Sequence, residues 1–111
     1  MPRYIANYTI VPPGRLLINR ITTINENHRL AAIQCANHEL AYTTYVSHPL
    51  LVVSITDAER LMGTHLQNAT DAAHLCRIMQ QQSTPFANIH TGDKVAVFKF
   101  NFANSRFTRL F

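Results

Sequence analysis

Apolar residues recur with a period of two along most of the chain, and with a period near 3.6 in only one segment. Period two is typical of strands, because successive side chains point to opposite faces of a sheet, whereas the longer period is typical of an amphipathic helix. The sequence therefore predicts an α+β protein, mainly β, with one helical segment (about 56–82). We expect strands at 3–11, 15–24, 29–35, 40–46, 50–55, 94–102 and 106–110.

Local signals support several of these boundaries. Residues 12–14, Pro-Pro-Gly, form a strong turn signal after the first strand. The run 50–55 is apolar on both faces, which is typical of a strand buried on both sides. Thr56, with Glu59 three residues on, has the spacing of a capping box and is expected to begin the helical segment.

The helical segment is open to one helix or two, because Gly63 interrupts it and Thr70 is a second capping residue. The sequence has 111 residues with no internal repeat and no long linker, so we expect a single domain, 1–111. Several strands and one helical insertion predict an antiparallel β-sandwich, or a partly open barrel whose opening the helix covers.

Charge and cysteine usage narrow the class of protein. The formal net charge is +4, but the lysines and arginines are scattered singly, which is typical of a solvated surface. Cys35 and Cys76 are isolated, so neither a disulfide framework nor a zinc site is indicated. No run approaches the roughly 20 apolar residues that a membrane span needs. We expect a cytoplasmic protein with no membrane partner.

The motifs of common enzymes are absent from the sequence. There is no HxH or HExxH spacing, no GxSxG elbow and no glycine-rich phosphate loop. We therefore expect no catalytic residue and no cofactor, and favour a non-catalytic binding or structural module over an enzyme. A metal-dependent hydrolase is the rival interpretation, and its ligands would be His48, His38 and His90, which lie beside strand ends.

A stripe of phenylalanines offers a second alternative. Three phenylalanines share one face of the predicted strand 94–102, as on a platform that stacks single-stranded bases. Period-two aromatics are more often core, and the glycine-containing RNP1 pattern is absent. The nucleic-acid-binding alternative would use Phe98, Lys99, Phe100, Phe102, Arg106 and Arg109.

Contiguous apolar residues also suggest self-association. Residues 16–18 are Leu-Leu-Ile between arginines, and Phe107, Leu110 and Phe111 bring apolar side chains to the end of the last strand. A β-rich domain must protect its strand edges, and few charges are available to do so. We expect a homodimer most simply, with a protein partner or a fully internal core as the alternatives.

Two segments resemble parts of the amidohydrolase superfamily. Residues 21–33, ITTINENHRLAAI, are similar to the hairpin that opens those enzymes, and residues 92–98, GDKVAVF, with 106–110 are similar to their closing strands. The resemblance implies a small composite β-sandwich domain without its catalytic barrel. Where those enzymes carry a metal-binding HxH, this chain has residues 56–59, TDAE, so the resemblance brings no metal ligand with it.

Overall fold

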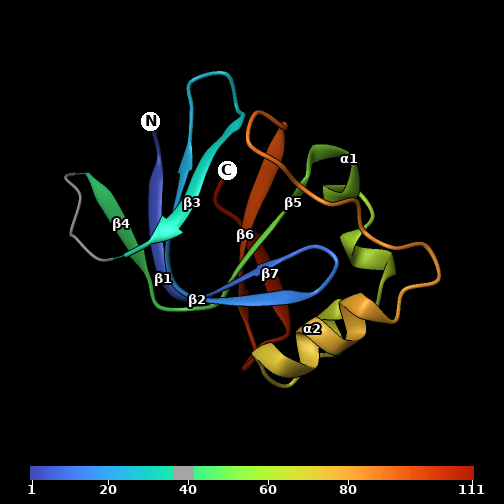
Figure 1. Ribbon diagram of the computed structural model, residues 1–111. Coiled ribbons are helices and arrows are strands. Elements are labelled where there is room, and N and C mark those ends of the chain that lie inside the picture. Colours follow the sequence, from blue (N-terminus) through green and yellow to red (C-terminus); the bar gives the residue numbers. More distant parts are fainter. Residues whose placement is uncertain (37–41) are drawn as a thin grey trace.

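The computed structural model describes residues 1–36 and 42–111. The strands are β1 (Arg3–Val11), β2 (Arg15–Ile24), β3 (Leu30–Cys35), β4 (Thr43–Val46), β5 (Leu50–Ser54), β6 (Val95–Asn101) and β7 (Arg106–Arg109). The helices are α1 (Ile55–Ala58) and α2 (Ala72–Gln80), with 3-10 turns η1 (Leu61–Gly63) and η2 (Leu66–Asn68) between them. The α+β, mainly β class is confirmed, and the helical elements lie together on one side of the strands (Figure 1).

All seven strands belong to one sheet, in the order β3-β2-β1-β5-β6-β7, with β4 also paired to β1. The sheet is not closed into a barrel, so a partly open barrel describes it better than two packed sheets. Curvature brings the start of β3 beside the start of β6, where Leu30 N donates to Asp93 O at 2.8 Å.

The expectation of a purely antiparallel sheet was wrong at β1. This strand pairs parallel with β4 and β5, which lie one after the other along the same edge of β1. The strands β2 and β3 lie on one side of β1. The strands β4 and β5 lie on its other side and run in the same direction as β1. Every other pairing of the named strands is antiparallel.

The helical segment forms two helices, α1 and α2, and each observed capping residue lies within two residues of the predicted threonine. Ser54 caps α1 by accepting from Asp57 N at 3.1 Å, in place of Thr56. Asp71 caps α2 by accepting from His74 N at 2.8 Å, in place of Thr70. In both cases the observed cap has extended backbone, as a capping residue requires.

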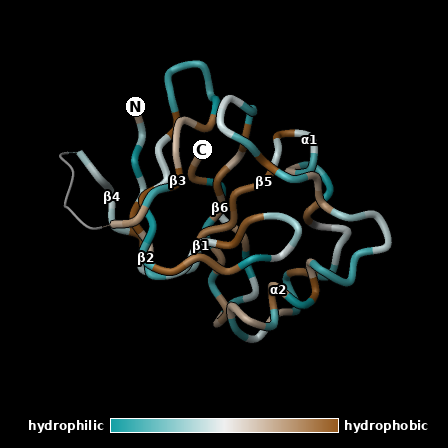
Figure 2. The backbone as a smooth tube through the Cα atoms, viewed as in Figure 1, coloured by the Kyte–Doolittle hydropathy of each residue, from teal (hydrophilic) through white to brown (hydrophobic). Residues whose placement is uncertain are grey.

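Two hydrophobic clusters lie on the two faces of the sheet. The helical-face cluster contains Ile10, Leu51, Val53, Leu61, Leu66, Ala69, Leu75, Cys76, Met79, Phe86, Ala96, Phe98 and Phe100. The open-face cluster contains Ala6, Val11, Ile24, Leu30, Val46, Leu50, Val52, Val95 and Val97. Figure 2 shows hydrophobic residues concentrated in the central strands and hydrophilic residues in the connecting loops.

The turn between β1 and β2 packs directly on α2. Gly14 has φ +135°, and a Cβ on it would lie 2.6 Å from Cys76 O. Gln80 Nε2 donates to Gly14 O at 2.7 Å. A side chain larger than hydrogen does not fit here, which explains why the turn carries glycine.

The apolar residues behind the expected dimer are mostly internal. Leu16 and Phe107 pack against the helical-face cluster, whereas Leu17, Leu110 and Phe111 pack against the open-face cluster. Among these residues Ile18 remains well exposed, at 60%. In the described ranges, no helix is both long enough and apolar enough to cross a bilayer.

Candidate functional site

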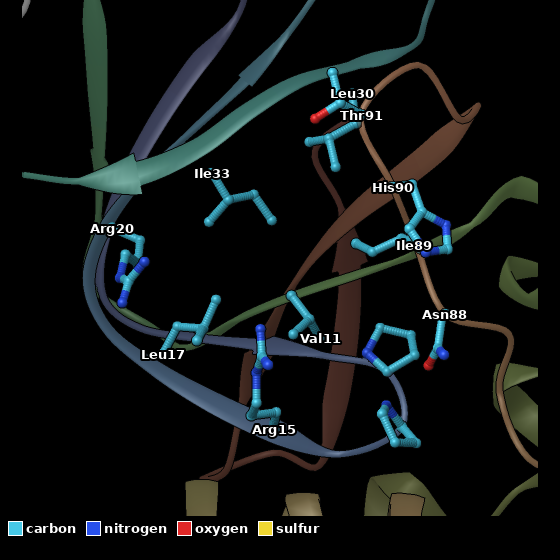
Figure 3. A pocket seen from close by; sticks show the side chains of 12 residues that line it. Val11, Arg15, Leu17, Arg20, Leu30, Ile33, Asn88, Ile89, His90 and Thr91 are labelled. Atoms are coloured by element: carbon cyan, nitrogen blue, oxygen red, sulfur yellow. The ribbon is translucent and has the colours of Figure 1, made fainter.

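A pocket of about 570 Å³ lies beside the open-face cluster. Its lining comes from the β1–β2 turn, β2, β3 and the loop that precedes β6 (Figure 3). The lining residues are Val11, Pro12, Pro13, Arg15, Leu17, Arg20, Leu30, Ile33, Asn88, Ile89, His90 and Thr91. Pockets of this size are typical of small-molecule sites.

Local backbone geometry in β2 brings three side chains to this pocket. Arg15 and Leu17 share a face by strand alternation, but Arg20 should then point to the opposite face. Asn19 between them has φ 51°, in the left-handed region that asparagine tolerates. The alternation is interrupted there, and Arg15, Leu17 and Arg20 all line the pocket.

The two arginines give the pocket its electrostatic character. None of the described residues that line the pocket carries a carboxylate. Arg20 Nε is buried and has no hydrogen-bond partner within the described part of the chain. The nearby Asp93 is already engaged, because its Oδ2 accepts from His90 N at 2.8 Å. The pocket thus combines positive charge with a largely apolar floor.

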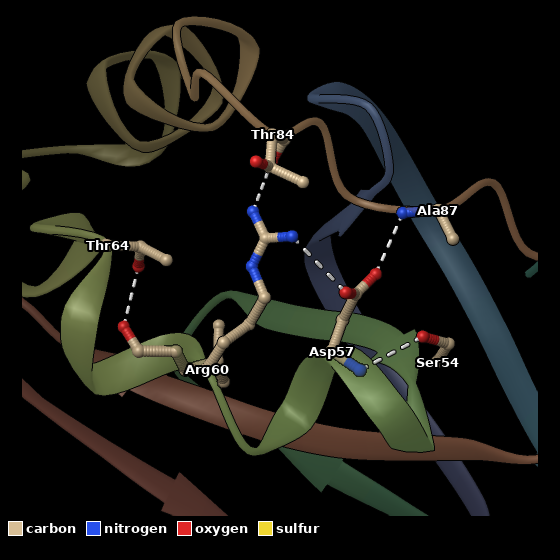
Figure 4. A network of polar contacts seen from close by, with 7 residues as sticks. Ser54, Asp57, Arg60, Thr64, Thr84 and Ala87 are labelled. Carbon is tan, nitrogen blue, oxygen red and sulfur yellow. Dashed lines mark hydrogen bonds and ion pairs between the residues drawn. The ribbon is translucent and has the colours of Figure 1, made fainter.

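The wall of the pocket is held by a buried carboxylate on α1. Asp57, 7% exposed, accepts through Oδ2 from Ala87 N at 2.8 Å, directly before the lining residues 88–91 (Figure 4). Its Oδ1 lies 3.5 Å from Arg60 Nη1. Arg60 also donates to Thr84 O and lies 4.3 Å from the centroid of the Phe86 ring. These contacts fix the loop that completes the pocket.

A second, smaller pocket contains a serine, a histidine and an aspartate. It has a volume of about 290 Å³ and includes Ser47, His48 and Asp71. Ser47 Oγ lies 3.1 Å from His48 Nδ1. Asp71, however, caps α2, and the described residues show no contact between it and His48. The three side chains therefore do not form the relay that activates a serine nucleophile.

The histidines expected as metal ligands do not come together where they are described. His48 lies in the second pocket and His90 lines the first. His38 lies outside the described residues, so its position relative to the other two is not established. Within residues 1–36 and 42–111, no group of three or more His, Cys, Asp or Glu side chains could hold a metal ion.

The expected phenylalanine platform is wrong as an exposed surface. Phe98 is 9% exposed and Phe100 is fully buried, and both belong to the helical-face cluster. Phe102 packs against the same cluster. The side chains of Phe98 and Phe100 are therefore covered, whereas Phe102 is half-buried and lines the second pocket. Of the cations assigned to that surface, Arg106 and Arg109 are exposed and Lys99 is half-buried.

Comparisons of the chain with protein-family models, curated proteins and solved structures found no match. The candidate site therefore depends on the geometry of this chain alone. Sequence analysis missed Arg15 and Arg20 because they appear as isolated charges. The available signal was Asn19, a residue that tolerates positive φ, between two positions of the same strand.

Proposed function

We propose that the chain is a non-catalytic binding module for a small molecule, and that its ligand site is the pocket of Figure 3. The observation that carries the proposal is a space of about 570 Å³ in which Arg15 and Arg20 lie beside an apolar floor. Such a space offers an apolar ligand contact area and offers its polar end hydrogen-bond donors.

The lining of the pocket favours binding over catalysis. A nucleophile needs a base within hydrogen-bond reach. Thr91 and His90 both line the pocket, but the described residues show no hydrogen bond between their side chains. The carboxylate nearest His90 is that of Asp93, which caps the backbone of the same turn. The site thus has groups that hold a ligand and lacks an activated nucleophile.

A fluorescence titration with N-phenyl-1-naphthylamine, a neutral apolar probe, tests the site. We expect saturable binding to the unmodified chain at one site, because the floor offers apolar side chains to a probe of this size. Ile33→Trp should abolish binding by filling the pocket. Ile55→Trp is the matched control, because Ile55 lies on α1, is 38% exposed and does not line the pocket.

Absence of saturable binding by the unmodified chain would contradict the proposal. Equal binding by Ile33→Trp and Ile55→Trp would also contradict it, since the probe would then be elsewhere. Urea unfolding of both variants establishes that each is folded at the titration temperature.

We also propose that the chain is related to the β-domain of the amidohydrolase superfamily. What supports it is that residues 21–33 and 92–98 are neighbours: Arg29 pairs with Lys94, and Gly92 N donates to Leu30 O at 2.8 Å. A cytoplasmic location is also proposed, and the two free thiols, Cys35 and Cys76, support it.

Self-association of two copies completes the proposal. Its support is that β3, β4 and β7 each pair with a single neighbour within the described residues, which leaves one edge of each available. Sedimentation equilibrium tests it, and a mass that stays at 12.6 kDa over micromolar concentrations would exclude the dimer.

A further inference from the structure

The charge of the pocket restricts what it can hold. Arg15 and Arg20 both line it, and among the described residues no acidic side chain lines it and neither guanidinium has an ion pair. Of the two, Arg15 is exposed and can remain hydrated, whereas the Nε of Arg20 is buried. A half-buried guanidinium that lines a pocket is stabilised by an anion that accepts hydrogen bonds from its accessible nitrogens.

The floor of the pocket requires an apolar part in the same ligand. Val11 and Leu30 belong to the open-face cluster, and Leu17, Ile33 and Ile89 pack against it. A wholly polar anion would leave these side chains in contact with water. An amphipathic anion would cover them and gain about 25 cal/mol for each Å² of apolar surface that it buries.

The backbone around the pocket favours a carboxylate over a phosphate. A guanidinium presents a fork of N–H donors that matches both kinds of anion, so the arginines alone do not choose between them. Phosphate sites are typically built from successive backbone N–H groups at glycine-rich turns or helix N-termini. In the described part of the chain, the residues that line this pocket include no glycine and none from a helix.

We propose that the ligand is an amphipathic carboxylate whose anionic end is bound by Arg20, with Arg15 beside it, and whose apolar body lies on Leu17, Ile33 and Ile89. The inference rests on the proposed function, because it names the ligand class of that same pocket. Arg20 makes the larger contribution, since its side chain is half-buried whereas that of Arg15 is exposed.

The test is displacement of N-phenyl-1-naphthylamine by decanoate, decanol and decyl phosphate, which share one apolar chain. We expect decanoate to displace the probe at a concentration at least about tenfold below that of decanol. Arg20→Met should remove most of this advantage and leave decanol unchanged. Arg20→Lys, which keeps the charge without the fork of donors, should lose part of it.

Arg106→Met is the matched control, because Arg106 is an exposed arginine on β7 that does not line the pocket. It should bind all three compounds as the unmodified chain does. If the probe binds the protein but decanoate and decanol displace it equally, the carboxylate is overturned and the pocket remains a binding site. Tighter binding of decyl phosphate would overturn the choice of anion. Failure of the probe itself to bind would instead overturn the proposed function.

Discussion

The two faces of the sheet are covered in different ways. The helical face is covered by α2, η1, η2 and Phe86, most of which follow one another in the sequence. The open face is covered by curvature of the sheet itself, by Ile89 and by residues 110–111. Both covers bury side chains completely and leave half-buried side chains at their edges, but the larger of the two pockets borders the open face.

This difference separates stability from binding within one small sheet. A contiguous helical segment can be packed tightly, because its apolar stripe is matched to the strands below it. A cover made from a loop and a strand end meets the sheet at fewer positions, so space remains between them. We expect stability to depend mainly on the helical face and ligand binding mainly on the open face.

Truncating one leucine on each face should give the largest contrast. Leu75 is fully buried in the helical-face cluster, so Leu75→Ala should lower the free energy of unfolding by about 3 kcal/mol. Leu17 is half-buried beside the pocket, so Leu17→Ala should lower it by about 1 kcal/mol. Urea unfolding measures both, and equal losses would show that the two faces are packed alike.

Asp57 lies on α1 and holds the loop that forms the wall of the pocket, so its removal should affect both stability and ligand binding. Asp57→Ala leaves Ala87 N without its acceptor and removes the ion pair to Arg60, so stability should fall by about 2 kcal/mol. Binding of the neutral probe should weaken as well, because residues 88–91 lose their anchor. Glu59→Ala removes an exposed carboxylate nearby and serves as the control. Unchanged probe affinity in Asp57→Ala would show that the loop is held by other contacts.

The two thiols should react at different rates, because one is exposed and the other is buried in the helical-face cluster. Cys35 is exposed at the end of β3, whereas Cys76 is buried in the helical-face cluster. We expect one thiol to react rapidly with Ellman's reagent in the native protein and the other at least about tenfold more slowly. Both should react rapidly in guanidinium chloride, and Cys35→Ser should remove the fast phase. A fast phase that persists in Cys35→Ser would place the helical face in rapid local opening.

The smallest expected effect is on the pH dependence of stability. Burial raises the pKa of the Cys76 thiol and of the Tyr4 phenol above their ordinary values. The unfolded chain therefore loses these protons at lower pH than the native protein does, so stability should fall as pH rises. The fall should begin near the ordinary thiol pKa, about 8.5, and continue near that of the phenol, about 10.

Tyr4→Phe separates the two contributions. It should flatten the upper part of the decline, as measured by urea unfolding from about pH 7 to about pH 11, and leave the part due to Cys76. Because this substitution also removes the hydrogen bond from Tyr4 Oη to Leu110 O, the slopes with pH are compared, not the absolute free energies. A stability that rises over this range would contradict the argument.

Sequence periodicity predicted the strands well and the caps less well. The bounds of β1 and β2 match the predicted ranges, because a proline-glycine turn separates two long alternating runs. The caps differ because Ser54 competes with Thr56 and Asp71 competes with Thr70, and only the local backbone conformation decides which oxygen accepts. The parallel pairing of β4 and β5 with β1 depends on a crossing between distant segments, which no local pattern encodes.

The candidate site was almost invisible to sequence analysis for a similar reason. The face switch at Asn19 brings Arg20 to the side of Leu17, and strict alternation would have assigned it to the other side. The opposite wall, residues 88–91, comes from a loop about 70 residues further along, and Asp57 anchors that loop. The phenylalanines of β6 were correctly assigned to one face of a strand, but period two does not indicate what covers that face.

The distribution of the pocket along the chain also determines when it can exist. Its floor is made by residues 11–33 and its wall by residues 88–91. During synthesis the chain emerges from its N-terminus, and domains fold as their parts become available. The strands β1, β2 and β3 would be complete well before the wall, so the nascent chain contains the apolar floor before the wall can cover it. A ligand has no complete site to occupy until residues 88–91 have been made.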